Sequence, residues 1–315
     1  MAGGQERILR SRIRSVQATK KITRAMELIA ASRIAKAQQR VAQAVPYADQ
    51  ITAVVRDLAA AGGEASSPLL APREVRKVCY VPVSADRGLC GGYNAMVLRA
   101  TEGQIKADVL AGRDYELVTV GRKAQNYFRF RNYKIADRFS GFSEQPTYAD
   151  AQSIARRAMA LYLSGEADRI LLIYTRFVSA GYQEVVMRPL VPLDREIMAG
   201  GDGRPDAAPN SSYEFEPDPS TILDSLVPRY IEARTYAALL NAAASEQAAR
   251  QRAMKAATDN AEELIKNLTR VMNRARQDAI TTEIMEIVGG AEALAADDAR
   301  DASFTLLQLD GPVLS

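Results

Sequence analysis

The sequence predicts a mixed α/β chain in which two long helices, one near each end, flank a small α/β domain. Three observations lead to this prediction: the distribution of glycine, the spacing of apolar residues in both end segments, and the alternation of strand-like and helix-like segments between them. Of the 19 glycines, 14 lie between Gly62 and Gly203, and none occurs at residues 5–61 or 204–288. Because glycine costs about 1 kcal/mol in a helix interior, the two glycine-free segments are expected to be helices.

The first helix forms a predicted N-terminal coiled-coil segment of residues 1–63. Its apolar residues recur every three or four positions, apart from one jump across Lys20–Lys21 and one step of five, which is close to the heptad spacing of a coiled coil. Pro46 predicts a kink or a local break, and Gly62–Gly63 predicts the end of a helix of roughly 85 Å. The predicted seam consists of Leu9, Ile13, Val16, Ile22, Met26, Ile29, Ile34, Ala37, Val41, Val45, Ala48, Ile51, Val55 and Leu58.

The middle segment, residues 64–199, alternates between apolar or β-branched runs and helix-like stretches. Such alternation is typical of a Rossmann-like α/β domain with a partly parallel sheet. Residues 200–217, rich in Gly, Pro, Asp and Ser, are expected to form a linker loop. Strands are predicted at residues 75–84, 117–121, 169–177 and 185–193, and helices at 93–111, 122–131 and 148–163.

The second long helix is predicted within residues 218–295. Asp218 is a suitable N-cap, Pro219 suits the first helical position, Pro228 predicts a bend, and Gly289–Gly290 predicts the end. Residues 296–315, acidic and then apolar, are expected to be a flexible tail. The predicted seam comprises Leu223, Leu226, Tyr230, Ala237, Leu240, Ala244, Gln247, Met254, Ala261, Leu264, Leu268, Met272, Ala275, Ala279 and Met285.

Helices of this length need partners, because propensity alone does not stabilise an isolated helix in water. One helix enters the central domain and the other leaves it, so the economical arrangement is an antiparallel coiled coil between them. The core of a helical bundle is the alternative.

Composition excludes several classes of function. The chain has no histidine, which removes imidazole-based catalysis and most zinc or iron sites, and its two cysteines cannot hold a metal cluster. No apolar run approaches the roughly 20 residues of a membrane span, and the N-terminus lacks the apolar core of a secretory signal. The expected location is therefore the cytoplasm.

Three chemistries remain as alternatives. Residues 84–92 follow a strand and precede a helix, where phosphate cradles occur, but they match neither common glycine-rich nucleotide motif. Residues 5–61 carry 11 Lys and Arg against 4 Asp and Glu, a net charge of +7 that suits nucleic acid, yet Tyr47 is the single aromatic residue for stacking. Cys79 and Cys90 could support redox chemistry, although their spacing matches no thiol motif.

Five blocks, in order along almost the whole chain, resemble the gamma subunit of F-type ATP synthases. The blocks are Lys21–Arg33 (KITRAMELIAASR), Ser84–Asn94 (SADRGLCGGYN), Ser245–Gln247 (SEQ), Met254–Ala261 (MKAATDNA) and Ile280–Ala291 (ITTEIMEIVGGA). No single block is decisive, but their ordered occurrence is specific.

This resemblance implies a non-catalytic central rotor. It implies helices inside a ring of three alpha and three beta subunits, contacts with the epsilon subunit and the c-subunit ring, and a peripheral position on the cytoplasmic side of the cell membrane. It further implies coupling of proton flow to ATP synthesis, regulation of ATPase activity, and no cofactor, metal or nucleic acid. By resemblance, Met26 faces an acidic loop of beta, Arg276 and Gln277 bond to another beta loop, and Asp86, Arg87, Gly88 and Cys90 lie near beta and epsilon.

Overall fold

The structure is a computed structural model that describes residues 2–60, 67–71, 73–193 and 218–309. The chain divides into two compact units, one made of Met1–Arg24 and Ala256–Ser315 and the other of Ala25–Lys255. We call them the helical unit and the sheet unit. The predicted linker 200–217 and the predicted helix end at Gly62–Gly63 lie outside the described residues.

Helix α1 (Ala2–Ala60) continues through Pro46, so the local break predicted there does not occur. Its buried and half-buried positions include an uninterrupted heptad series from Leu9 to Leu58, as a coiled-coil seam requires. The series comprises Leu9, Ile13, Val16, Lys20, Thr23, Glu27, Ala30, Ile34, Ala37, Val41, Ala44, Ala48, Ile51, Val55 and Leu58.

This seam corrects part of the sequence-based prediction for α1. Ile22 and Ile29 were expected in the seam but are 61% and 52% exposed, and Met26 is half-buried beside the series rather than in it. The seam positions of that stretch are instead Lys20, Thr23 and Glu27. Lys20 and Thr23 are tolerated there because each has a partner on helix α6 (Pro219–Leu309), Glu262 and Thr258 respectively.

In the helical unit, α1 and helix α6 (Pro219–Leu309) pair in opposite directions. The Thr23 and Thr258 hydroxyls share a hydrogen bond of 2.8 Å, and Lys20 Nζ lies 3.0 Å from Glu262 Oε2. Going from Thr23 back to Lys20 on α1, the partner on α6 moves forward from Thr258 to Glu262. The two helices are therefore antiparallel, as the sequence predicts.

Helix α6 runs through Gly289 and Gly290, so the end predicted there is wrong. Residues 296–309, expected to be a flexible tail, continue the helix, and residues 310–315 lie outside the described part. The glycine penalty is overcome because helix-favouring residues, mostly Ala, Glu and Leu, follow at 291–296. Leu264 and Met285, predicted in the seam, are 47% and 67% exposed.

The sheet unit contains a five-stranded sheet in the order β3-β2-β1-β4-β5. Strands β1 to β4 run parallel, and β5 pairs antiparallel with β4. The strands are β1 (Lys77–Pro82), β2 (Asp114–Val120), β3 (Asp137–Phe139), β4 (Arg169–Phe177) and β5 (Gln183–Val191). The sequence pattern missed β3, which has three residues and is too short to show alternation.

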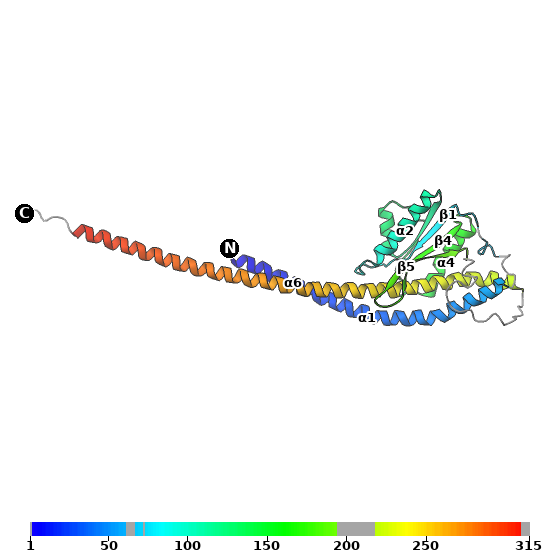
Figure 1. Cartoon of the computed structure of the whole chain (residues 1–315), viewed down its shortest axis with the longest axis horizontal. Coiled ribbons are helices and arrows are strands. Elements are labelled where there is room, and N and C mark those ends of the chain that lie inside the picture. The colour runs from blue at the N-terminus through cyan, green and yellow to red at the C-terminus, as the bar shows by residue number, and fades with distance from the viewer. Residues whose placement is uncertain (1, 61–66, 72, 194–217, 310–315) are drawn as a thin grey trace, which may run out of the picture. The chain divides into compact units, whose positions relative to one another are not determined.

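Side chains alternate across the sheet and create two cores, and helices cover both faces of the sheet (Figure 1). On one face, Cys79 and Val81 of β1 pack in a core with α1, α4 (Tyr148–Leu163) and α6. On the other face, Val78 and Tyr80 pack with α2 (Tyr93–Leu110) and α3 (Arg122–Phe130). The two long helices therefore form one outer layer of the sheet unit.

Within the described part of the chain, no helix is both long enough and apolar enough to cross a membrane.

Candidate functional site

The segment 84–92 links β1 to α2, and its first three residues cap the neighbouring helix α3. Arg122 N donates to Asp86 Oδ1 at 3.0 Å, Lys123 N to the Ala85 carbonyl at 3.1 Å, and Ala124 N to Ser84 Oγ at 2.8 Å. The first turn of a helix leaves such N–H groups without helical partners. Consecutive residues of one loop thus satisfy consecutive amides of another element.

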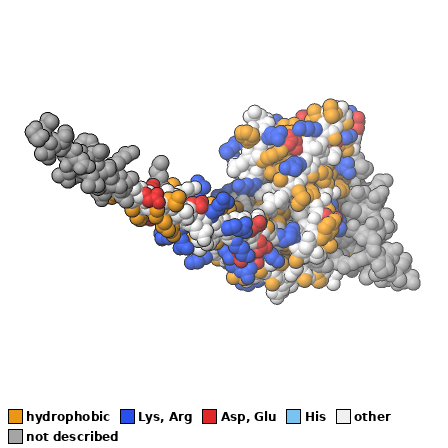
Figure 2. Space-filling view, turned by 60° about the vertical axis from the view of Figure 1, so that its left-hand side comes forward, with side chains coloured by type: hydrophobic (Ala, Val, Ile, Leu, Met, Phe, Trp, Pro, Cys, Tyr) orange, Lys and Arg blue, Asp and Glu red, His pale blue; other side chains and the backbone are white. Residues whose placement is uncertain are grey.

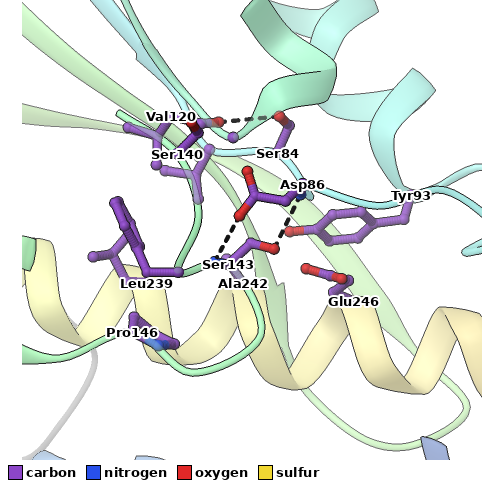
Figure 3. A pocket seen from close by; sticks show the side chains of 13 residues that line it. Ser84, Asp86, Tyr93, Val120, Ser140, Ser143, Pro146, Leu239, Ala242 and Glu246 are labelled. Atoms are coloured by element: carbon purple, nitrogen blue, oxygen red, sulfur yellow. Dashed lines mark hydrogen bonds between the residues drawn. The ribbon is translucent and has the colours of Figure 1, made fainter. Parts of the chain in front are cut away.

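The second carboxylate oxygen of Asp86 binds the loop that follows β3. Gly141 N donates to Asp86 Oδ2 at 2.8 Å. Ser143 N donates to the same oxygen at 3.1 Å, and Asp86 N donates to Ser143 Oγ at 3.0 Å (Figure 3). Two amides of the segment itself are also already satisfied, because Ala85 N donates to Asn94 Oδ1 at 2.9 Å and Asp86 N to Ser143 Oγ, and Asp86 adds a negative charge where a phosphate would lie. This arrangement disfavours a nucleotide site at residues 84–92.

An open groove of about 450 Å³ borders this segment at Asp86, Arg87 and Arg122. The enclosed cavity beside Asp86 is too small for a cofactor. It measures about 10 Å³ and lies among Asp86, Tyr93, Ser143 and Glu246 (Figure 3), whereas ligand pockets usually enclose at least about 300 Å³. Among the described residues, no group of three or more Cys, Asp or Glu side chains is placed to hold a metal ion.

The close approach between β1 and β2 depends on Gly121, the N-cap residue of α3. Its φ of +89° favours glycine, and an added Cβ would overlap the carbonyl oxygen of Ser84. Ser84 Oγ also donates to the Val120 carbonyl at 3.0 Å. The sequence alone does not reveal Gly121 as a key position, because the contact joins residues 37 positions apart in the chain.

We expect Asp86→Asn to lower the free energy of unfolding by about 1–3 kcal/mol, because the new amide group would face a main-chain donor of the cap. Chemical denaturation of the full chain measures this loss. The control is Asp114→Asn, whose carboxylate is exposed and accepts a local bond from Tyr115 N at 2.8 Å. Equal losses in the two variants would contradict the capping role of Asp86.

The remaining predicted loop residues differ in accessibility. The Arg87 side chain is 75% exposed, and Gly88 is half-buried, with its carbonyl accepting from Arg250 Nη2 at 3.3 Å. Cys90 is buried, and Asn94 Nδ2 donates to its sulfur at 3.1 Å. Of these three residues, Arg87 is the one with an exposed side chain that a partner could contact.

Both cysteines are unpaired and buried. Burial raises the pKa of Cys79 to about 12 and also raises the pKa of Cys90, so both thiols stay protonated near neutral pH. Because the thiolate is the reactive form, the structure gives no support to the redox alternative.

A buried ion pair on α6 supports the same loop. Arg250 Nη2 donates to Glu246 Oε1 at 2.7 Å, and their side chains are 7% and 1% exposed. Burial raises the pKa of Glu246, while Arg250 and a hydrogen bond from Ser143 oppose this rise. The sequence shows that Glu246 and Arg250 are four positions apart on a helix, but it does not show that both side chains are buried.

The other predicted contact residues lie on the long helices. Met26 is half-buried on α1 in the sheet unit. Arg276 and Gln277 are exposed on α6 in the helical unit, as expected of residues available to a partner. Their contacts with other subunits remain predictions.

Comparison with known proteins identifies the family. Residues 5–294 match the family described as ATP synthase. The ATP synthase gamma chain of Frankia casuarinae is 52% identical over 298 residues, which cover 93% of this chain and 99% of the relative. The chain belongs to the ATP synthase gamma-chain family. The gamma chain of Mycobacterium tuberculosis is 48% identical over 303 residues, covering 92% of this chain and 97% of the relative.

Solved structures of ATP synthases have the same fold as this gamma-family chain. A chain of the Euglena gracilis mitochondrial ATP synthase (OSCP/F1/c-ring, rotational state 3) matches with a TM-score of 0.65 and 18% identity, covering 94% of this chain and 96% of that one. A chain of the central stalk and c-ring structure from Tetrahymena thermophila matches with a TM-score of 0.54 and 24% identity, covering 75% and 99%. At these identities the likeness concerns the fold alone.

Proposed function

We propose that this gamma-family chain is the central rotor shaft of an F-type ATP synthase, itself without catalytic activity. It couples proton flow through the membrane sector to ATP synthesis or hydrolysis on the beta subunits and regulates ATPase activity. Its partners are three alpha and three beta subunits, the epsilon subunit and the c-subunit ring. It occupies a peripheral position on the cytoplasmic side of the cell membrane.

The observation that carries this proposal is an unpaired apolar row on α6 in the helical unit. The register set by Thr23 and Thr258 brings the start of α1 beside α6 at about residue 280, because paired antiparallel helices advance equally. All residues from 281 to 294 are exposed. The large apolar side chains there are Ile284, Met285, Ile287, Val288 and Leu294, each 47% to 71% exposed.

The spacing of this row indicates a protein partner. Ile280, Ile284, Ile287 and Leu294 are separated by four, three and seven positions, so they share one face of the helix. Contiguous exposed apolar side chains of this size mark interaction surfaces rather than ordinary solvent-facing helix. A surrounding ring of alpha and beta subunits fits a helix that emerges from its own coiled coil.

The basic character of α1 supports an acidic partner. Residues 5–61 carry a net charge of +7, and Figure 2 shows Lys and Arg side chains along the helices. The acidic beta loop implied by family resemblance would meet this surface. Nucleic acid is the competing polyanion, and the following experiment separates the two.

Co-purification tests the function. We expect the tagged chain, co-expressed with the other subunits, to recover alpha and beta in equal amounts, with about one copy of this chain for three of each. Mass spectrometry and absorbance at 260 nm identify the partners. Recovery of the chain with nucleic acid and without alpha and beta would overturn the proposal.

Met26→Lys is expected to reduce ATP synthesis at least about fivefold while leaving the stability of the chain nearly unchanged, because it places a further cation at the predicted contact with beta. ATP synthesis in energised vesicles and thermal unfolding measure the two effects. The control is Leu28→Lys, a 58% exposed position on another side of the same helical turn. A similar loss of synthesis in both variants, or a loss of assembly in the Met26 variant, would argue against a specific contact.

A further inference from the structure

The loop between β3 and α4, residues 140–147, connects several elements of the sheet unit through one carboxylate. Its base is fixed by Asp86, which accepts hydrogen bonds from Gly141 and Ser143. The next residue along the loop is Glu144, whose side chain is 22% exposed. The backbone is thus held where Glu144 can reach the long helices.

Three arginines from three different elements converge on Glu144. Arg33 of α1 donates from Nη1 to Glu144 Oε2. Arg87 of the segment 84–92 and Arg250 of α6 place their Nη1 atoms 3.7 and 3.9 Å from Glu144 Oε1. All four residues belong to the sheet unit.

Glu144 supplies a negative charge among several cations. Arg250 Nη1 is buried and has no hydrogen-bond partner, so Glu144 is an ion-pair partner to that end of the guanidinium, while Glu246 binds the other end. Lys36 and Arg40 of α1 line the same small groove as Arg33 and Glu144. Without the Glu144 charge, cations of α1, α6 and the loop would face one another with one fewer negative charge between them.

We propose that Glu144 is the positioning residue that holds the α/β domain against both long helices. Torque is then transmitted between the domain and the shaft without relative movement of the two. The arginines that it joins come from α1, from α6 and from the segment 84–92. Coupling through a packed protein requires such a contiguous set of interactions. The transmission of torque depends on the proposed rotor function, whereas the positioning role of Glu144 does not.

Single-molecule rotation tests the proposal in a complex of this chain with alpha and beta subunits. A bead is attached through Leu110→Cys, because Leu110 is 89% exposed at the end of α2 while Cys79 and Cys90 are 0% and 2% exposed. We expect Glu144→Gln to increase the angular variance of the stalled rotor about twofold. Arg33→Gln should change it in the same direction, and Glu144→Asp should restore most of the stiffness.

The matched control is Glu184→Gln. Glu184 is 30% exposed and pairs with Arg176 within the β4–β5 hairpin, so its loss removes an ion pair without releasing a helix. An unchanged variance in Glu144→Gln, or an equal increase in Glu184→Gln, overturns the proposal. If Glu144→Gln fails to assemble, Arg33→Gln decides the outcome in the same way.

A second measurement is independent of rotor function. Hydrogen exchange on the full chain should show faster exchange of the Gly141 and Ser143 amides in Glu144→Gln than in Glu184→Gln. Faster exchange together with a wild-type chain that does not bind alpha and beta would refute the proposed function but keep the positioning role. Equal exchange in the two variants would refute the positioning role even if the complex forms.

Discussion

Gly121→Ala is expected to prevent stable folding of the sheet unit, with a loss of more than about 4 kcal/mol in the free energy of unfolding. The new Cβ would overlap the Ser84 carbonyl oxygen and lie 2.6 Å from the Ser84 hydroxyl. Moving Ser84 away would break the cap that this residue and its two successors place on α3. The measurement is chemical denaturation of the full chain, or the yield of soluble protein where no folded state remains.

Gly112→Ala is the matched control for this substitution. Gly112 has a similar φ of +78°, but an added Cβ would meet nothing within 4 Å. The control therefore carries the backbone strain alone, about 1–2 kcal/mol. A loss at Gly121 no larger than at Gly112 would show that the approach of Ser84 is not a constraint on the fold.

Arg250→Ala is expected to lower the free energy of unfolding by about 3–5 kcal/mol, since it leaves Glu246 buried without its cation. The Gly88 carbonyl also loses its bond from Arg250, so the segment 84–92 should become more mobile. The double variant Glu246→Gln with Arg250→Met removes both charges and should recover most of the loss. Equal instability of the single and double variants would show that packing, not charge, is what Arg250 provides.

The loss in Arg250→Ala should depend on pH in a defined direction. Burial already raises the pKa of Glu246 in the native chain, and removing Arg250 raises this pKa further. A group with a raised native pKa favours folding below its unfolded pKa, roughly 4.3 for glutamate, and this contribution is lost as pH rises through the native pKa. The difference between variant and wild type should therefore shrink between neutral and acidic pH. A difference that stays constant with pH would contradict this assignment.

The seam of α1 illustrates where the sequence-based prediction failed. The spacing of the apolar residues at 22, 26 and 29 predicts that they lie in the intramolecular seam, because coiled coils usually bury such residues. The structure instead places Thr23 and Glu27 there and exposes Ile22 and Ile29. This helix carries two apolar stripes, and spacing alone does not tell which of them is buried in the intramolecular seam.

At the candidate site, too, the sequence pattern drew attention to the right segment but did not show the structural reason for it. The sequence drew attention to residues 84–92, but the reason for their pattern is a cap on α3, a helix that begins 30 residues further along the chain. Glu144 stood in no motif, and its importance follows from three arginines brought to it by distant elements.

By itself, the sequence determined the class of fold, the two long helices, four of the five strands and the family, because these depend on local spacing and on ordered motifs. Only the tertiary structure decided which helix face is buried, how far α6 extends, and which buried charges meet. Those features depend on contacts between residues far apart in the chain, where each partner's position fixes the environment of the other.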